Sequence, residues 1–99
     1  MGFQVIWTDE AIDDLRQLVA YISKDNPDAA GKLGEKLIQK SMLLADHPRF
    51  GKVFRQLGRD NIREMSVPPD RLIYEIDDVG LKIFVRILHH GAWQEPEIK

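Results

Sequence analysis

Two helical patterns stand early in this chain of 99 residues and three β patterns follow them, and this order allows few folds. Apolar residues recur at helical spacing from Ala11 to Ile22 and again in residues 30–45. Asn26-Pro27 separates the two patterns, since proline cannot continue a helix but suits the first turn of the next. So short a joint predicts an antiparallel helical hairpin, with the second helix running to about Asp46.

Strand patterns occupy the rest of the chain. A short apolar strand is expected at residues 3–7, before the hairpin. Residues 61–67, 71–77 and 81–89 follow as strands separated by turn signals, which predicts a consecutive antiparallel meander. The expected fold is α+β: an N-terminal strand, an antiparallel helical hairpin and a three-stranded antiparallel meander that forms one small sheet. A single domain over residues 1–99 accounts for the whole length.

The composition places the chain in a broad class. It is 43% hydrophobic and 30% charged, as expected of a soluble globular protein, and it has no cysteine. The lack of cysteine fits a reducing compartment, and we expect a cytoplasmic protein. No apolar run reaches the roughly 18 residues of a membrane span, and no signal peptide is recognisable at the N-terminus.

Charge is distributed unevenly around a net value of −2. Residues 1–48 hold 5 Lys/Arg against 8 Asp/Glu, whereas residues 49–71 hold 6 basic against 3 acidic residues. The basic segment is either a docking patch for an acidic partner or a solvated loop face, and charge alone leaves both open. A general nucleic-acid binder would be more basic overall.

Residues that could carry chemistry are few. His89 and His90 are adjacent on a strand and point to opposite faces, so they do not predict a metal site with His47. No phosphate-binding loop or nucleophile elbow is present, and we expect no metal or cofactor. Cations on successive strands near Tyr74 could serve metal-free RNA cleavage, or they could be ordinary residues of an exposed sheet face. These cations are Arg63, Arg71 and Arg86.

Six segments, in order, resemble the RelE/ParE superfamily of toxins from bacterial type II toxin–antitoxin modules. They are the first strand and helix, DNPDAA at residues 25–30, HPRFGK at 47–52, IREM at 62–65, RLIYE at 71–75 and VRILHHGA at 85–92. The resemblance covers nearly the whole chain. The Asn-Pro joint and the ending around His89-His90-Gly91 resemble the ParE branch most.

The ParE resemblance implies a toxin that binds DNA gyrase and blocks replication, with no catalytic residues of its own. The expected binding surface lies in residues 49–63 and in the tail at residues 91–99. Its residues are Arg49, Lys52, Arg55, Arg59, Arg63 and Trp93.

The alternative is a RelE-like, ribosome-dependent endoribonuclease that cuts messenger RNA, for which Arg71, Arg86 and Arg63 are the catalytic candidates. Arg71 stands where that branch has a sheet arginine. Its arginine after the last strand and its C-terminal tyrosine do not carry over, because His89-His90-Gly91 and Trp93 occupy those regions. The acidic pI of 5.9 also suits a ribosome binder poorly.

Either branch implies a cognate antitoxin and therefore a hetero-oligomer. The antitoxin's C-terminal segment is expected to lay an apolar helix or strand along the helical hairpin and the sheet. A third interpretation is that the protein has kept the fold but lost toxicity. It would then serve only as a ligand of the antitoxin or have no partner at all.

Overall fold

The first strand leads directly into the first helix. In the computed structural model, which describes residues 2–91, β1 (Gln4–Trp7) is followed by α1 (Asp9–Ser23). Thr8 makes the transition: its hydroxyl accepts the amide hydrogen bond of Ala11 at 3.2 Å and donates to the Val85 carbonyl at 3.0 Å. The residue that caps the helix therefore also ties the helix to the sheet.

The second helix packs antiparallel to the first, as the sequence predicts. α2 (Pro27–Met42) begins with proline, and the Asn26 side chain accepts a hydrogen bond from the Ala29 amide at 3.1 Å. A short 3-10 helix, η1 (Leu43–Ala45), extends α2 almost to the expected end. None of the described helices combines the length and the apolar character needed to cross a bilayer.

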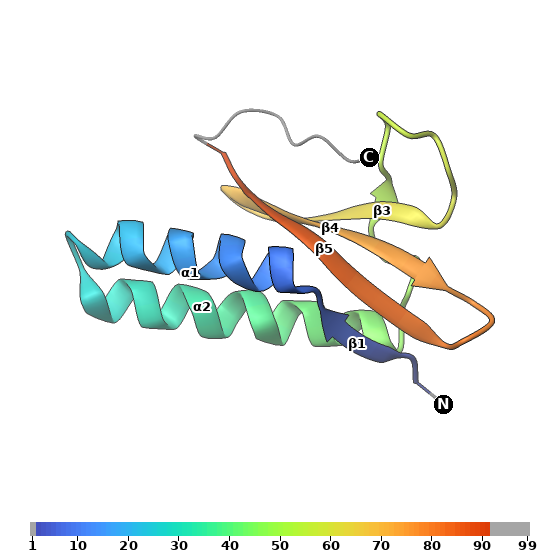
Figure 1. Cartoon of the computed structure of the whole chain (residues 1–99), viewed down its shortest axis with the longest axis horizontal. Coiled ribbons are helices and arrows are strands. Elements are labelled where there is room, and N and C mark those ends of the chain that lie inside the picture. The colour runs from blue at the N-terminus through green and yellow to red at the C-terminus, as the bar shows by residue number, and fades with distance from the viewer. Residues whose placement is uncertain (1, 92–99) are drawn as a thin grey trace.

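Five strands form one mixed sheet in the order β1-β5-β4-β3-β2 (Figure 1). The strands after the helices are β2 (Lys52–Val53), β3 (Ile62–Val67), β4 (Asp70–Asp77) and β5 (Lys82–His90). β3, β4 and β5 make the predicted antiparallel meander. The sheet is wider than that meander because β1 adds to β5 in parallel and β2 adds to β3 at the other edge.

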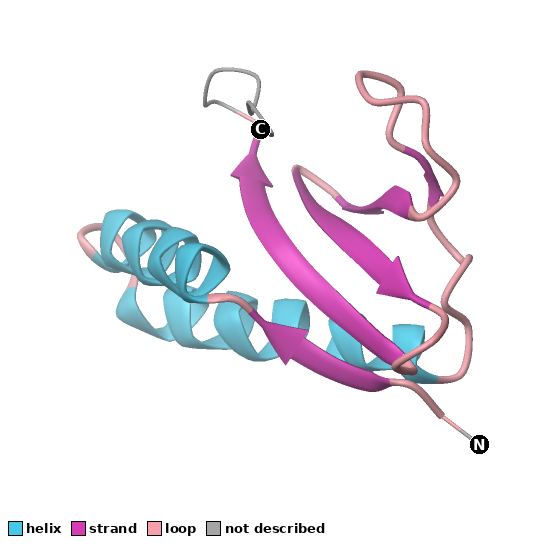
Figure 2. Ribbon diagram, turned by 45° about the vertical axis from the view of Figure 1, so that its right-hand side comes forward, coloured by secondary structure: helices cyan, strands magenta, loops and turns pink. Residues whose placement is uncertain are grey.

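The helical hairpin covers one face of this sheet (Figure 2). The main core lies between the two layers, where alternate strand residues meet the buried stripes of both helices. Its fully buried members include Leu18 and Leu37 from the helices and Tyr74 and Ile83 from the sheet. We call the opposite side of the sheet the open face.

The open face carries a smaller core of its own. Phe54, in the loop after β2, packs there on Ile62 and Ile73, and Leu57 and Ile87 complete the cluster. This loop therefore folds back over the sheet at the β2 edge. The second core holds the segment that follows β2 close to the charged residues of the open face.

A partly buried polar contact joins β1 to α2. The indole Nε1 of Trp7 donates to the hydroxyl of Ser41 at 3.0 Å, and that hydroxyl donates to the Ile38 carbonyl at 2.6 Å. A serine on the apolar side of a helix commonly donates its hydroxyl hydrogen to a carbonyl one turn earlier, and Ser41 does so. The hydroxyl has a second role, because it satisfies the Trp7 N–H where the strand crosses the helix.

Candidate functional site

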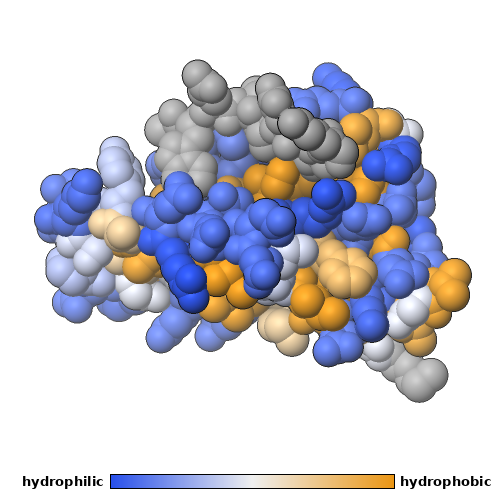
Figure 3. Space-filling model, in the orientation of Figure 1, coloured by the Kyte–Doolittle hydropathy of each residue, from blue (hydrophilic) through white to orange (hydrophobic). Residues whose placement is uncertain are grey.

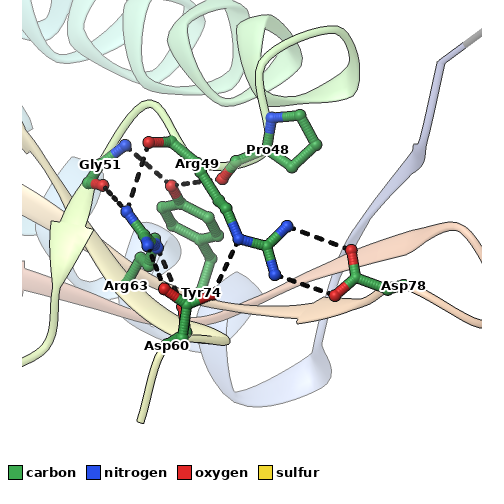
Figure 4. Close-up of polar contacts among 7 residues, drawn as sticks. All are labelled: Pro48, Arg49, Gly51, Asp60, Arg63, Tyr74 and Asp78. Carbon is green, nitrogen blue, oxygen red and sulfur yellow. Dashed lines mark hydrogen bonds and ion pairs between the residues drawn. The ribbon is translucent and has the colours of Figure 1, made fainter. Parts of the chain in front are cut away.

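The loop between η1 and β2 is fastened to the sheet by Tyr74. Its buried phenol donates to the Pro48 carbonyl at 2.7 Å and accepts the amide hydrogen bond of Gly51 at 2.9 Å (Figure 4). Burial raises the pKa of Tyr74, so the phenol stays protonated. Position 51 must be glycine, because a Cβ there would overlap the Glu64 carbonyl and the Tyr74 hydroxyl. The start of the basic segment is thus set by a core residue.

Arg49 links this loop to two others (Figure 4). Its guanidinium makes two hydrogen bonds to Asp78, at 2.9 and 3.1 Å, and one to Asp60 at 2.8 Å. The hydrogen bonds to Asp78 and then to Asp60 raise the pKa of Arg49. In return, Arg49 lowers the pKa values of the Asp78 and Asp60 carboxyl groups, with Arg63 adding to the effect on Asp60.

Arg63 completes the same network from β3. It pairs with Asp60 at 2.5 Å and donates to the Gly51 carbonyl at 2.9 Å, and only 14% of its side chain is exposed. We name Arg49, Asp60, Arg63 and Asp78 the arginine network. Two of the six residues predicted to bind the target are therefore committed to internal carboxylates.

The other predicted target-binding residues lie on the outer side of this network. Lys52 reaches Glu64, 3.5 Å away, across the β2–β3 pair. Arg55 and Arg59 are exposed, and neither forms an ion pair with a residue in the described range 2–91. Two apolar side chains are exposed beside them, Phe50 at 65% and Val53 at 38%. Trp93 lies outside the described residues.

We call the exposed set in residues 50–59 the basic–apolar loop. It combines aromatic, aliphatic and cationic side chains, which is the chemistry of protein-binding hot spots. Its residues are Phe50, Lys52, Val53, Arg55 and Arg59.

The three arginines considered for RNA cleavage do not come together. Arg71 lies opposite Ser66 on the open face, whereas Arg63 lies opposite Tyr74, whose side chain faces the helices. Tyr74 is three positions along the strand from Arg71, a distance of about 10 Å at roughly 3.3 Å per residue. Arg71 pairs with Glu64 at 3.3 Å, and Arg86 pairs with Glu75 at 3.2 Å. Each sheet arginine therefore has a carboxylate beside it.

The adjacent histidines point to opposite faces, as strand geometry requires. His89 lies opposite Arg71 on the open face, is 6% exposed, and its Nδ1 accepts a hydrogen bond from Arg71 Nε at 3.5 Å. The side chain of His90 pairs with the buried carboxylate of Asp70 at 2.5 Å. Within residues 2–91, no three His, Asp or Glu side chains gather in a metal-binding arrangement.

Sequence reasoning did not identify the acidic partners Asp60, Asp78 and Glu64. One of them could have been found from the hairpin alone. Since Val67 pairs with Asp70 across the Pro68-Pro69 turn, alternation puts Glu64 on the same face as Arg71, one diagonal step away. Asp60 and Asp78 carry no such local signal, because they meet Arg49 only when three separate loops converge.

The fold and its loops define a class: a two-helix hairpin on one face of a small mixed sheet is the architecture of RelE/ParE superfamily toxins. The ParDE system from P. aeruginosa superposes with a TM-score of 0.74 at 15% identity, covering 89% of this chain and 95% of that chain. The RelBE2 toxin–antitoxin complex from Mycobacterium tuberculosis gives 0.68 at 22% identity, covering 91% and 99%. A variant of the E. coli toxin RelE in the free state gives 0.67 at 18%, covering 93% and 86%.

Sequence comparison narrows the class to one family. Residues 5–92 match the family described as "ParE toxin of type II toxin-antitoxin system, parDE". The chain is also 36% identical over 87 residues to a curated protein named Toxin RelE2 from Caulobacter vibrioides, covering 87% of this chain and 93% of that protein. The chain belongs to the ParE toxin family of type II toxin–antitoxin systems.

Proposed function

We propose that this toxin acts by binding DNA gyrase and blocking replication, and that the basic–apolar loop makes the contact. The observation that supports the proposal most is how this loop is held. Tyr74 and the arginine network fix both sides of the loop, yet Phe50, Val53, Arg55 and Arg59 remain exposed. A loop held in place before binding loses little conformational entropy on docking.

The charges of the sheet favour binding over catalysis. The cations proposed for RNA cleavage each have an adjacent carboxylate, and Arg63 lies on a different face from Arg71. Cleavage of a phosphodiester develops negative charge on the phosphate in the transition state. A catalytic site therefore needs positive charge at that point that no carboxylate neutralises. A docking surface needs no such site.

Supercoiling by purified DNA gyrase tests this directly. We expect the wild-type chain to inhibit the reaction, and the double substitution Arg55→Ala with Arg59→Ala to weaken inhibition by at least tenfold. Lys32→Ala with Lys36→Ala is the matched control, because it removes two exposed charges from α2 and should leave inhibition unchanged. Equal losses in both double variants would contradict a specific role for the loop.

Ribosome-dependent RNA cleavage is the second candidate, favoured by the contact between Arg71 and His89 on the open face. A guanidinium beside an imidazole supplies a phosphate ligand and a proton carrier. Pulse-labelling within minutes of inducing the chain separates the two functions. Loss of DNA synthesis first supports gyrase binding, and loss of translation first, abolished by Arg71→Ala, supports cleavage.

A cognate antitoxin is the expected partner for either target. Solved structures with this fold include toxin–antitoxin complexes, namely RelBE2 from M. tuberculosis and intact RelBE from E. coli. Apolar side chains also emerge among the charged ones over the helical hairpin (Figure 3). The large apolar side chains exposed on α2 and η1 are Ile38, Met42 and Leu43. An antitoxin helix that covers them would bury apolar area the toxin alone leaves in water.

A further inference from the structure

The basic–apolar loop carries positive charge that no carboxylate of its own balances. No acidic residue occurs in residues 50–59, whereas Lys52, Arg55 and Arg59 are all exposed. Arg55 and Arg59 form no ion pair within the described part of the chain. Lys52 contacts Glu64, but 78% of the lysine side chain is exposed. The loop therefore presents a cationic surface to any partner that meets it.

The carboxylates next to the loop are already neutralised by other cations. Asp60, the residue that follows the loop, lies 2.8 Å from Arg49 and 2.5 Å from Arg63. Glu64, on the neighbouring strand, pairs with Arg71 at 3.3 Å as well as with the loop's lysine. Because each of these carboxylates has an arginine of its own outside the loop, neither cancels the charge of the loop.

The acidic part of the chain lies too far away to offset that charge. Exposed Asp9 and Glu10 begin α1, directly after β1, whereas the loop extends from β2 at the opposite edge of the sheet. Four strand spacings of roughly 4.8 Å separate these edges, about 19 Å in all, and physiological salt screens exposed charges beyond about 8 Å. The loop therefore meets a partner as a cation, although the net charge of the chain is −2.

This charge limits which surface of DNA gyrase the loop can meet. A groove that binds duplex DNA is itself basic, because its lysines and arginines neutralise the phosphates. Like charges that face each other across an interface disfavour association, so such a groove would repel Lys52, Arg55 and Arg59. An acidic surface with an apolar centre matches these cations and also matches the exposed side chains of Phe50 and Val53.

We propose that the loop docks on an acidic patch of gyrase outside the DNA-binding groove, so that the toxin and DNA occupy the enzyme together. This placement rests on the gyrase function proposed above and adds where on the enzyme the toxin binds. The exposed guanidinium groups of Arg55 and Arg59 supply N–H donors for carboxylates of the partner, and Phe50 supplies an aromatic anchor. DNA does not expel the toxin, because the two ligands do not share a site.

Fluorescence anisotropy tests this placement, with the chain labelled with fluorescein at its N-terminal amine and titrated with purified gyrase. We expect the Kd for free gyrase and for gyrase saturated with linear duplex DNA to agree within twofold. Raising KCl from about 50 to about 200 mM should weaken binding to free gyrase at least fivefold, because opposite charges make the contact.

Charge reversal provides a second measurement. Arg55→Glu with Arg59→Glu should bind free gyrase at least tenfold more weakly than Arg55→Ala with Arg59→Ala, because an acidic patch repels the glutamates. Lys32→Glu with Lys36→Glu makes the same change of charge on α2 and should match wild type. Circular dichroism checks that each variant is folded. If the glutamate variant of the loop does not fold, the salt dependence of the wild-type chain decides the charge of the patch.

Four results overturn the proposal. Saturating DNA that weakens binding more than twofold places the contact in the DNA-binding groove. A glutamate variant that binds at least as well as the alanine variant, or a Kd that salt does not change, shows that the patch is not acidic. Binding to duplex DNA alone, as tight as to gyrase, makes DNA the ligand.

The same titrations separate this placement from the proposed function. A chain that binds neither free nor DNA-saturated gyrase refutes gyrase as the target, and the placement falls with it. A chain that binds free gyrase but is released by DNA keeps gyrase as the target and refutes the placement alone.

Discussion

The guanidinium of Arg49 donates two hydrogen bonds to the carboxylate of Asp78, a residue 29 positions later in the sequence. Arg49 follows the helical hairpin, whereas Asp78 stands in the turn between β4 and β5. The same guanidinium also holds Asp60, in the loop before β3. One side chain thereby connects three loops at one end of the sheet, and the basic–apolar loop begins at this junction.

The ion pairs of Arg49 predict that the stability of the folded protein depends on pH. Arg49 lowers the pKa values of Asp60 and Asp78 below the ordinary 3.8, so folding favours their charged forms. The stabilisation is complete above the unfolded pKa and is lost as pH falls through the lower folded values. We expect Arg49→Gln to lower the urea midpoint at pH 6, with a gap to wild type that narrows as the pH falls below 3.8 and closes once both carboxyl groups are protonated in the folded protein. A gap that does not depend on pH would refute this linkage.

Tyr74→Phe tests the fastening of the loop to the sheet. The substitution removes two hydrogen bonds and leaves the Gly51 amide without its partner in a buried position. We expect a loss of about 1–3 kcal/mol in the free energy of unfolding, measured by urea denaturation. Tyr21→Phe is the control, because that hydroxyl is on an exposed residue of α1 and its loss should cost little. Equal costs would mean the phenol of Tyr74 contributes no special contact.

Two substitutions of Asp14 are expected to change the stability of the protein in opposite directions. Its carboxylate accepts the Leu88 amide hydrogen bond at 3.0 Å, and burial raises its pKa against the lowering effect of that bond. A raised folded pKa means that the charged form costs stability above the unfolded pKa. Asp14→Asn keeps an acceptor without the charge, and we expect it to be as stable as wild type or more so at pH 7. Asp14→Ala should lose about 1 kcal/mol, because the strand amide loses its acceptor.

Phe50→Ser tests the apolar part of the proposed gyrase contact. Phe50 is 65% exposed, so the substitution should leave the melting temperature nearly unchanged. As a hot-spot residue it should weaken inhibition of gyrase by roughly thirtyfold, which corresponds to about 2 kcal/mol. Val79→Ser is the matched control, since Val79 is 97% exposed in the β4–β5 turn. Inhibition that survives Phe50→Ser unchanged would place the contact elsewhere.

Local chemistry made much of the fold predictable. The caps Thr8 and Asn26, the Pro27 start of the second helix and the alternation of the last three strands each depend on neighbours in sequence. The opposite faces of His89 and His90 follow from strand geometry in the same way. The order of these local features along the chain is what resembles the RelE/ParE superfamily.

The sheet edges required more than local signals. β1 could be recognised as a strand, but its parallel place beside β5 depends on the hairpin carrying the chain back across the sheet. β2 is two residues long and is defined by its pairing with β3, not by any pattern of its own.

The sequence by itself determined the helices, the meander, the family and the presence of a basic segment. Only the tertiary structure decided which of those basic residues are paired within the chain. Arg49 pairs with Asp60 and Asp78, and Arg63 pairs with Asp60, while Arg55 and Arg59 form no ion pair with a residue in the range 2–91. The physical reason is that periodicity is read from adjacent residues, whereas an ion pair forms between whichever charges the folded backbone brings within a few ångströms.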